Sequence, residues 1–432
     1  MEAFGCQMNA FDAETVRGAF LERGWSLAEE PGSADCALLL TCSVRDGAEE
    51  RIRGRLGALQ EAKRNRPGLR VGILGCMAQR DGEAILEQFP VLDLVAGTRQ
   101  FTRVPDLIDS VEVTGRPVLN LGTEADPMPR VRTLAGRDPG GHAFVPVMRG
   151  CDLNCTYCIV PTVRGRVVSR DEEDVLEEVR RLVGDGVAEI TLLGQTVNSY
   201  GRERPRGQRG LGPLLGRLAG VEGLEWIRLV TLHPSYLDGE LCAALADLTH
   251  LAGPVPLPAQ SGSDRILKLM KRGYTTDLYR RRLDMLRNAV PGVEITTDWI
   301  VGFPGETAEE ASMSEVLLRQ IAPLKSYVFR YSVRPGTAAA NHPDDVPESD
   351  KALRNTALLE AQSDAAASRA ALRTGCRMDV RVAASSRRAG YSAGLSREGF
   401  RVWLPEGIAE GTRVEVEVTG VHGAALVGRP VG

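Results

Sequence analysis

The sequence predicts an α/β protein that ends in a small all-β segment, and three observations lead to this prediction. Short apolar runs alternate with helical patterns over residues 1–120. The same strand–helix theme recurs in six successive units over residues 142–370. After residue 373 the helical periodicity stops, and short alternating stretches separated by glycine follow. Strand–helix alternation is typical of parallel sheets with helices on their faces, whereas short alternating stretches are typical of small β-barrels.

Length and composition fit a globular protein of several domains. The chain has 432 residues, of which 43% are hydrophobic and 25% charged, and these values exclude a disordered or collagen-like chain. No apolar run approaches the roughly 18 residues that would span a bilayer, and no signal peptide is visible. We therefore expect a cytoplasmic protein without membrane association. The formal net charge of −4 excludes a globally basic nucleic-acid-binding protein but not a local basic surface.

The N-terminal part, residues 1–122, reads as a parallel sheet with helices on its faces. Residues 37–41 and 71–74 are predicted to be buried strands, and 92–96 is a weaker third. Between the first two strands, apolar residues recur at the spacing of an amphipathic helix: Ala48, Ile52, Leu56, Leu59 and Ala62. Only five residues precede Cys6, so we expect the first strand to be short. The pattern predicts a Rossmann-like or flavodoxin-like domain.

The central part, residues 142–372, is predicted to be a partial α/β barrel. A segment rich in glycine and proline, 123–141, precedes it and reads as a linker. Helical patterns separate the candidate strands, and an Ala- and Leu-rich stretch at 352–372 looks like a closing helix. The candidate strands are 143–148, 188–193, 226–231, 254–257, 293–300 and 325–331. Six strand–helix units in such a length are typical of an α/β barrel or part of one.

The C-terminal part, residues 373–432, reads as a small β-barrel with a local excess of positive charge. The segment contains nine arginines, among them Arg387 and Arg388, and six acidic residues, so its local net charge is 9 − 6 = +3. Three aromatic side chains look exposed: Tyr391, Phe400 and Trp403. Basic charge with exposed aromatic rings is typical of nucleic-acid-binding modules. A purely structural or dimerising barrel fits the segment as well.

The strongest functional motif is Cys151-x3-Cys155-x2-Cys158, which follows the apolar strand candidate 144–148. Three thiolates in one tight loop can hold three irons of a cubane cluster and leave the fourth iron open to a small molecule. Zinc sites usually have four ligands from paired cysteine or histidine groups, and the nearest histidine, His142, precedes the strand. The loop lies at the carboxyl end of the first barrel strand, where α/β barrels place their active sites. The motif therefore indicates an iron–sulfur active site.

A second set of cysteines, Cys6, Cys42 and Cys76, is spaced by about one strand–helix unit. Cys42 and Cys76 directly follow predicted strands, and Cys6 follows the short start of the chain. The carboxyl ends of parallel strands meet at one edge of a sheet, so these residues can converge. Three converging thiolates again suit a cluster with one open iron, although independent buried cysteines fit the spacing equally well. The other cysteines read as small apolar or surface residues: Cys36, Cys242 and Cys376.

Motifs along nearly the whole chain resemble the radical SAM methylthiotransferase family. Three segments look like the signatures of that family's N-terminal domain: Gly5-Cys6-Gln7-Met8-Asn9, Thr41-Cys42-Ser43-Val44-Arg45 and Gly75-Cys76-Met77-Ala78-Gln79. The stretch from Arg149 to Pro161 looks like its radical SAM loop. Further matching motifs follow in order: Arg164-Gly165, Ser169-Arg170, Leu193-Gly194-Gln195, Gln260-Ser261-Gly262-Ser263, Met270-Lys271-Arg272-Gly273-Tyr274-Thr275, Ile300-Val301-Gly302-Phe303-Pro304-Gly305-Glu306-Thr307, Tyr331-Ser332 and Arg334-Pro335-Gly336-Thr337. The last segment matches the family's TRAM domain in position and character, and only loosely in motif.

The resemblance implies a radical SAM barrel, two 4Fe-4S clusters and S-adenosyl-L-methionine as cofactor. An auxiliary cluster on Cys6, Cys42 and Cys76 would carry the sulfur to be transferred, and one S-adenosylmethionine would methylate it. A second S-adenosylmethionine, bound at the cluster on Cys151, Cys155 and Cys158, would yield a 5′-deoxyadenosyl radical that activates the substrate carbon. The resemblance implies no catalytic residue beyond the cluster ligands. Contacts to S-adenosylmethionine are expected from barrel-strand ends: Gln195, Gln260, Ser263 and Gly302.

Within the family, the N-terminal signatures resemble the tRNA branch. That branch adds a methylthio group to carbon 2 of N6-isopentenyladenosine at position 37, next to the anticodon. The expected partners are the anticodon arm of tRNA and a low-potential electron donor such as flavodoxin or ferredoxin; the sulfur donor stays unknown, and we expect a monomer. Departures from the family pattern, such as Leu40 and Pro256, remove no proposed ligand.

Three other interpretations stay open. Enzymes of the same chemistry could act on an aspartate of a ribosomal protein or on threonylcarbamoyladenosine in tRNA. The third is a non-catalytic iron–sulfur protein that binds RNA or senses redox state. A sensor needs neither two open-iron clusters nor a full barrel, which disfavours the third interpretation.

Overall fold

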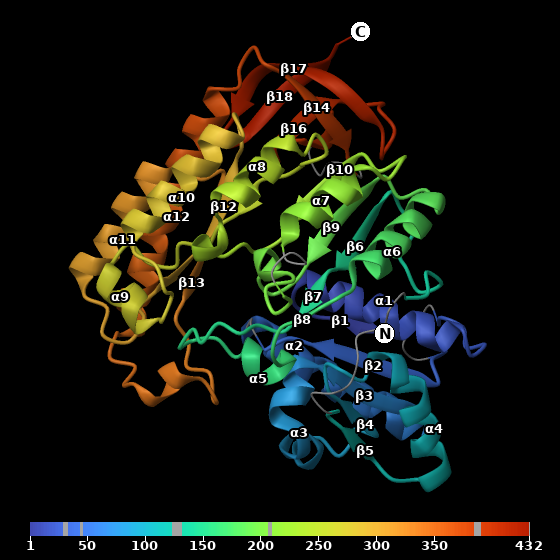
Figure 1. Ribbon diagram of the computed structural model, residues 1–432. Helices are drawn as coiled ribbons and strands as arrows, with labels where there is room; N and C mark the ends of the chain where they lie inside the picture. Colours follow the sequence, from blue (N-terminus) through green and yellow to red (C-terminus); the bar gives the residue numbers. More distant parts are fainter. Residues whose placement is uncertain (29–32, 44–45, 123–131, 206–209, 384–389, 432) are drawn as a thin grey trace. The chain divides into compact units, whose positions relative to one another are not determined.

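The first strand–helix repeats form the parallel sheet that the sequence predicts. In the computed structural model, five parallel strands lie in the order β1-β2-β3-β4-β5 (Figure 1). Their bounds are β1 (Glu2–Ala3), β2 (Cys36–Thr41), β3 (Arg70–Gly75), β4 (Leu94–Ala96) and β5 (Val118–Asn120). The predicted strands 37–41, 71–74 and 92–96 are confirmed as β2, β3 and β4, and the first strand is as short as expected.

Helices cover both faces of this sheet because alternate strand residues point to opposite sides. Helices α2 (Asp46–Asn65) and α3 (Cys76–Gln88) pack on the face that carries Leu39 and Ile73. Helices α1 (Gln7–Leu21) and α4 (Val104–Thr114) pack on the face that carries Leu40 and Leu74. Leu40, a departure from the family pattern, is therefore a fully buried core residue. A doubly wound sheet of this kind gathers its loops at the carboxyl edge of the strands.

The structure describes residues 1–28, 33–43, 46–122, 132–205, 210–383 and 390–431. These residues divide into two units by their contacts. The first unit comprises Met1–Leu153, Ile159–Val187 and Leu192–Gln195. The second unit comprises Asn154–Cys158, Ala188–Thr191 and Thr196–Gly432. Among the described residues, no helix combines the length and the apolar character that crossing a membrane requires.

The first unit contains further elements outside the five-stranded sheet and its four helices. They are η2 (Phe101–Arg103), β6 (His142–Pro146), β7 (Met148–Arg149), α5 (Val160–Arg164), β8 (Val168–Ser169) and α6 (Glu172–Gly184). The predicted linker 123–141 is described only from Arg132 onward, since 123–131 lie outside the described residues. Arg132 is buried and forms ion pairs with Glu14 and Glu178. The described end of this segment is therefore anchored by buried charges.

The predicted barrel strands are all present, and they form two three-stranded sheets. Strand β9 (Glu189–Leu193) lies in the sheet β10-β9-β6 with β10 (Trp226–Leu229). Strands β11 (Val255–Pro256), β12 (Ile295–Val301) and β13 (Lys325–Arg330) form the parallel sheet β11-β12-β13. Parallel bridges between Ile227 and Leu251 and between Gln260 and Trp299 extend the pairing beyond these strands. This arrangement fits the partial α/β barrel that the sequence predicts.

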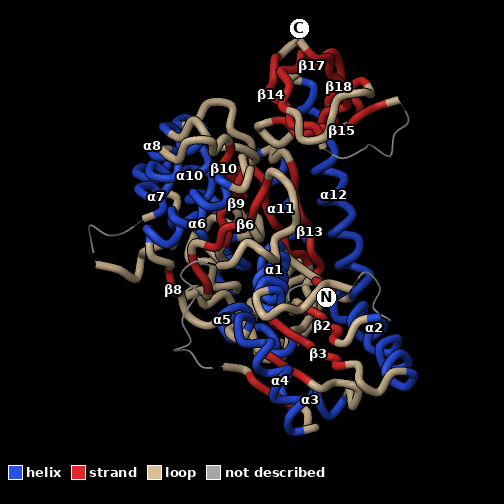
Figure 2. Tube along the Cα trace, turned by 90° about the vertical axis from the view of Figure 1, so that its right-hand side faces the viewer, coloured by secondary structure: helices blue, strands red, loops and turns tan. Residues whose placement is uncertain are grey.

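Helices connect the strands of the second unit. They are η3 (Val197–Ser199), α7 (Leu211–Ala219), η4 (Pro234–Tyr236), α8 (Gly239–Asp247), α9 (Asp264–Leu269), α10 (Thr276–Ala289), α11 (Ala308–Ile321), η5 (Ala338–Asn341) and α12 (Glu348–Ala371). Figure 2 shows α12 running along β13 toward the C-terminal strands. The closing helix predicted at 352–372 is confirmed as α12.

The C-terminal strands close into the small β-barrel that the sequence predicts. The barrel order is β14-β15-β16-β18-β17, with bounds β14 (Arg377–Val382), β15 (Tyr391–Ser396), β16 (Arg401–Pro405), β17 (Arg413–His422) and β18 (Ala425–Pro430). One prediction is wrong: Phe400 is not exposed but packs in the barrel core. Its apolar neighbours on alternate positions, Val402 and Leu404, face the same interior. Tyr391 and Trp403 are half-buried, and Arg387 and Arg388 lie outside the described residues.

Candidate active site

Cys6, Cys42 and Cys76 converge at the carboxyl edge of the five-stranded sheet. Cys6 caps the start of α1, Cys42 directly follows β2, and Cys76 begins α3. A hydrogen bond with Cys42 and the charge of Arg164 lower the pKa of Cys6 to about 5, against the opposing effect of burial. Burial raises the pKa of the Cys76 thiol, although Arg164 opposes the shift. The structure therefore brings together three thiols that are far apart in the sequence.

Two glycines and an asparagine allow this convergence. Gly5 has φ +125°, and a side chain there would overlap the Cβ atom of Cys42. Gly75 has φ +97°, and a side chain there would lie 2.8 Å from the carbonyl oxygen of Thr41. Asn9 donates hydrogen bonds from Nδ2 to the carbonyl oxygens of Phe4 (2.7 Å) and Thr41 (2.9 Å). These contacts hold the loops that carry Cys6 and Cys42 against each other.

A buried arginine lies against this set of cysteines. Arg164 ends helix α5, and its Nη2 donates to Asp12 Oδ2 at 2.7 Å and to Asn9 Oδ1 at 3.2 Å. Burial raises the pKa of Asp12 to about 6, while the charge of Arg164 works in the opposite direction. Cys76 packs against Ile159 and Val163 of the same short segment. In the sequence, Arg164 belongs to the motif Arg164-Gly165, and its distance along the chain from the cysteines gives no sign of this contact.

Replacing Asp12 by alanine should destabilise the protein strongly. The change leaves the buried guanidinium of Arg164 without its carboxylate, and breaking a buried ion pair in this way costs about 3–5 kcal/mol. The free energy of unfolding, measured anaerobically by denaturant titration with equal iron content in all samples, checks this. Asp106→Ala is the matched control, because Asp106 pairs with Arg23 at the surface, where such pairs contribute about 0–1 kcal/mol. Equal losses in the two variants would contradict the prediction.

The Cys151–Cys158 loop is held by hydrogen bonds in each unit. In the first unit, the Cys151 N–H donates to the carbonyl oxygen of Gly165 at 3.0 Å, and Cys151 is buried. In the second unit, Cys158 N–H donates to Cys155 O at 3.1 Å. Thr156 donates from its N–H to Met270 O and from Oγ1 to Leu269 O. The backbone at Cys151 is therefore held within the first unit, and the backbone at Cys155 and Cys158 within the second.

A second buried arginine lies against Cys155. Arg272 Nη1 donates to Cys155 Sγ at 3.2 Å and to the Tyr157 hydroxyl at 3.3 Å. Its Nε donates to the hydroxyl of Tyr274 at 3.1 Å, and that hydroxyl donates to Pro258 O at 2.9 Å. Burial raises the pKa of Tyr157 and of Tyr274 above their usual value, so both phenols stay neutral. Each cysteine set thus has one buried guanidinium whose positive charge favours thiolate ligands.

His233 is a further polar residue at the carboxyl ends of the second unit's strands. Its ring contacts those of Tyr236 and Tyr274, with centroids 5.3 and 5.4 Å apart. Burial lowers the pKa of His233 to about 3. Because Nδ1 accepts from Ser235 N–H, the proton of the neutral ring lies on Nε2. A backbone hydrogen bond with Arg272 acts against the effect of burial on this pKa, so the ring is held in place by the chain.

The four residues expected to contact S-adenosylmethionine occupy strand ends. Gln260 adopts φ +70° and pairs its backbone with Asp298 and Ile300, at β12. Ser263 caps α9, accepting from Ile266 N–H and donating to Glu310 at 2.8 Å. Gly302 follows β12 with φ +70°, and its N–H donates to Glu306 at 2.6 Å. Gln195, in the first unit, has a buried Oε1 without a partner among the described residues. Their role in cofactor binding stays a prediction.

Each cysteine set offers three thiols, the number that a 4Fe-4S cluster with one open iron requires. Among the described residues, no three His, Cys, Asp or Glu side chains come close enough to hold one ion. The thiolate ligands of a four-iron cube lie further apart than the ligands of one ion, and the ligand role of the three cysteines in each set stays a prediction. The remaining cysteines lie elsewhere: Cys36 in β2, Cys242 buried in α8 and Cys376 exposed.

Comparisons with known proteins agree with this arrangement. Residues 1–97 match the family described as "Uncharacterized protein family UPF0004", and residues 145–316 match the radical SAM superfamily. The tRNA-2-methylthio-N(6)-dimethylallyladenosine synthase of Geobacter sulfurreducens is 39% identical over 437 residues, covering 100% of this chain and 97% of that protein. The protein of the same name from Syntrophotalea carbinolica is 44% identical over 354 residues, covering 81% of this chain and 80% of that protein.

Among solved structures, the radical S-adenosylmethionine methyltransferase TsrM of Kitasatospora setae is similar in fold. Its TM-score is 0.56 at 15% identity, covering 74% of this chain and 70% of that chain. At this identity the likeness concerns the fold alone, and it supports the barrel and the parallel sheet described above.

Proposed function

Because the chain belongs to the family of the tRNA-2-methylthio-N(6)-dimethylallyladenosine synthases, we propose that it methylthiolates carbon 2 of N6-isopentenyladenosine at position 37 of tRNA. The chain is a radical SAM methylthiotransferase by its family, and its cofactors are S-adenosylmethionine and two 4Fe-4S clusters. The proposed substrate is the one in the name of the relatives, the tRNA-2-methylthio-N(6)-dimethylallyladenosine synthases. We further propose that it acts in the cytoplasm as a monomer, with a low-potential donor such as flavodoxin or ferredoxin.

The observation that carries this proposal is the position of the segment after Cys158. Ile159 follows Cys158 directly in the chain, and Ile159 packs against Cys76 in the first unit. Helix α5 then ends at Arg164, whose guanidinium lies beside Cys6 and Cys76. One short segment therefore connects the two cysteine sets. Sulfur transfer to a radical-activated carbon requires the reacting groups to be held within contact distance, and a short link along the chain suits this requirement.

Each part of this chain has a distinct task in the proposed reaction. When bound, the clusters would supply an electron for cleavage of S-adenosylmethionine at Cys151, Cys155 and Cys158 and a sulfur carrier at the other three cysteines. Arg272 orients the thiol of Cys155, and Arg164 holds a fixed positive charge beside Cys6 and Cys76. In the first unit, the buried Oε1 of Gln195 is a polar group that a bound cofactor could satisfy.

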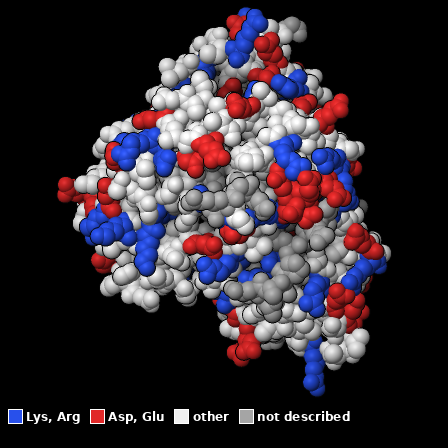
Figure 3. Space-filling model, in the orientation of Figure 1, with Lys and Arg blue, Asp and Glu red and all other residues white. Residues whose placement is uncertain are grey.

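The C-terminal barrel supports an RNA substrate through one exposed feature. Several of its arginines pair with carboxylates: Arg377 with Glu415, Arg381 with Glu225, Arg413 with Asp379, and Arg429 with Glu417. Arg401 is exposed, and its guanidinium lies 5.4 Å from the ring centroid of Trp403. A guanidinium stacked on an aromatic ring is a surface on which bases and phosphates bind. Figure 3 shows that acidic and basic side chains are otherwise interspersed on the visible face.

Nucleoside mass spectrometry of tRNA from a strain that lacks this gene tests the proposal. We expect N6-isopentenyladenosine to accumulate without its 2-methylthio derivative. Wild-type protein should restore the derivative, whereas Cys155→Ala should not. Loss of the methylthio group from threonylcarbamoyladenosine, or from an aspartate of a ribosomal protein, with unchanged isopentenyladenosine derivatives, would instead assign the chain to that substrate.

A further inference from the structure

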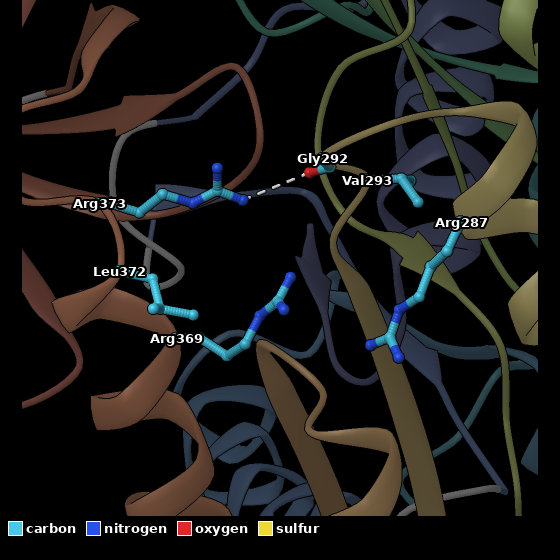
Figure 4. Close-up of a pocket in the computed structure, with 6 residues that line it drawn as sticks. All are labelled: Arg287, Gly292, Val293, Arg369, Leu372 and Arg373. Carbon is cyan, nitrogen blue, oxygen red and sulfur yellow. Dashed lines mark hydrogen bonds between the residues drawn. The ribbon is translucent and has the colours of Figure 1, made fainter.

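A cavity lined by three arginines lies in the second unit, away from both cysteine sets in the sequence. Its volume is about 290 Å³. The cavity is lined by Arg287 of α10, by Arg369 and Leu372 at the end of α12, by Arg373, and by Gly292 and Val293 before β12. Figure 4 shows the guanidinium groups of Arg369 and Arg373 on one side of the space and that of Arg287 on the other. Nothing in the proposed reaction uses these residues.

One buried carboxylate serves two of the three arginines. Glu294 accepts from Arg369 Nη2 and from Arg373 Nη2 at Oε1, each at 2.6 Å. Arg373 also approaches the carbonyl oxygen of Gly292 at 3.4 Å, the contact drawn in Figure 4. Two guanidiniums thus share a single negative charge. This ion-pair cluster fixes the end of α12 to the start of β12. Because the two guanidiniums carry two positive charges and Glu294 one negative charge, the cluster has a net positive charge.

Arg287 has no carboxylate of its own. Its Nη2 donates to the carbonyl oxygen of Ile321 at 2.6 Å, and no ion pair involves it among the described residues. Burial and the charge of Arg369 lower the pKa of Arg287, whereas Glu294 and Asp284 raise it. With three guanidiniums against these two carboxylates, the cavity keeps a net positive charge. An anion in the space would offset the repulsion between the arginines.

We propose that this cavity binds a phosphate group, which in the proposed reaction belongs to the backbone of the RNA substrate. Guanidinium forks match the tetrahedral oxygens of phosphate and form charge-assisted hydrogen bonds with them. Gly292 and Val293 leave room beside the forks. The assignment of the phosphate to RNA rests on the proposed function. The inference that the three arginines bind a phosphate group does not depend on it.

The position of the cavity suits an extended polyanion. It lies at the amino end of β12, and Gly302 follows the carboxyl end of the same strand. The seven residues of β12 span about 23 Å at the usual rise of a strand. The C-terminal barrel is close to the cavity, since Arg373 lies over the ring of Phe400 at 5.4 Å. An RNA arm that contacts the C-terminal barrel could therefore place a backbone phosphate in this cavity.

Salt dependence of RNA binding by Arg287 variants tests the inference. The slope of log K against log salt concentration should become shallower by about 0.7–0.9 in Arg287→Gln, as expected for one lost phosphate contact. The probe is a synthetic anticodon stem-loop measured by fluorescence anisotropy with the cluster-loaded full chain. Arg287→Lys keeps the charge and should keep the slope. Arg281→Gln is the matched control, since Arg281 is exposed on the same helix and pairs with Asp277.

A second arm uses inorganic phosphate and the wild-type protein. Phosphate should raise the melting temperature of the wild type and of Arg281→Gln but not that of Arg287→Gln. If Arg287→Gln loses the effect of phosphate on the melting temperature but keeps the salt-dependence slope of RNA binding, the cavity binds a free phosphate compound. A wild type that binds phosphate but no RNA would overturn the proposed substrate while the cavity assignment stands. Equal RNA slopes and equal phosphate effects in wild type and Arg287→Gln would overturn the inference.

Discussion

Replacing Cys155 by alanine is expected to abolish the reductive cleavage of S-adenosylmethionine. The loop offers three thiols to a cluster, and a cluster with one open iron needs all three. Cys155 also accepts the hydrogen bond from Arg272 at 3.2 Å, so its sulfur has a defined position. We expect release of 5′-deoxyadenosine to fall to background under anaerobic, reducing conditions. Cys151→Ala and Cys158→Ala should behave in the same way.

A matched control separates loss of the cluster from loss of the fold. Cys242 is buried like Cys155, but it lies within α8 and outside both cysteine sets. Cys242→Ala should therefore keep full cleavage activity. In Cys155→Ala, Arg272 retains its bonds to Tyr157 and Tyr274, so the melting temperature of the iron-free protein should change little. Wild-type cleavage by Cys155→Ala would show that the loop holds no catalytic cluster.

Much of the fold could be predicted because its apolar patterns are regular. The strands β2 and β3 contain continuous apolar runs, and helices separate the successive strands of the α/β barrel. Helix α1 escaped prediction for a physical reason. Its buried face carries Asn9, Asp12 and Glu14, which bind distant arginines and hide the usual amphipathic pattern. Polar residues are acceptable there only because their partners are supplied by other parts of the chain.

The site was predictable in its cysteines and not in its arginines. A cysteine after each strand indicates convergence, because parallel strands end at one edge. Arg164 and Asp12 are 152 residues apart, and Arg272 and Cys155 are 117 residues apart. Sequence spacing carries no sign of such contacts. The prediction that Phe400 is exposed was wrong because the closure of the barrel depends on contacts between strands that are distant in the sequence. In the closed barrel, alternate residues such as Phe400, Val402 and Leu404 point into the core.

Replacing Cys6, Cys42 or Cys76 by alanine should separate sulfur transfer from radical formation. These thiols converge in the first unit with Arg164, and none belongs to the Cys151–Cys158 loop. Cleavage of S-adenosylmethionine should therefore continue, whereas the methylthiolated nucleoside should disappear. Iron content should fall from about eight to about four per chain if each set of cysteines holds a four-iron cube.

Cys36→Ala is the control for this second set, because Cys36 begins the same strand, β2, that ends before Cys42. Its thiol is half-buried and lies at the amino end of β2, whereas Cys42 follows the carboxyl end where the other two thiols converge. The control should keep both iron content and methylthiolation. The variants must also keep cleavage, because loss of both activities would indicate damage to the first unit as a whole. An iron content near eight in all of Cys6→Ala, Cys42→Ala and Cys76→Ala would rule out the auxiliary cluster, and the convergence of these thiols would then be structural.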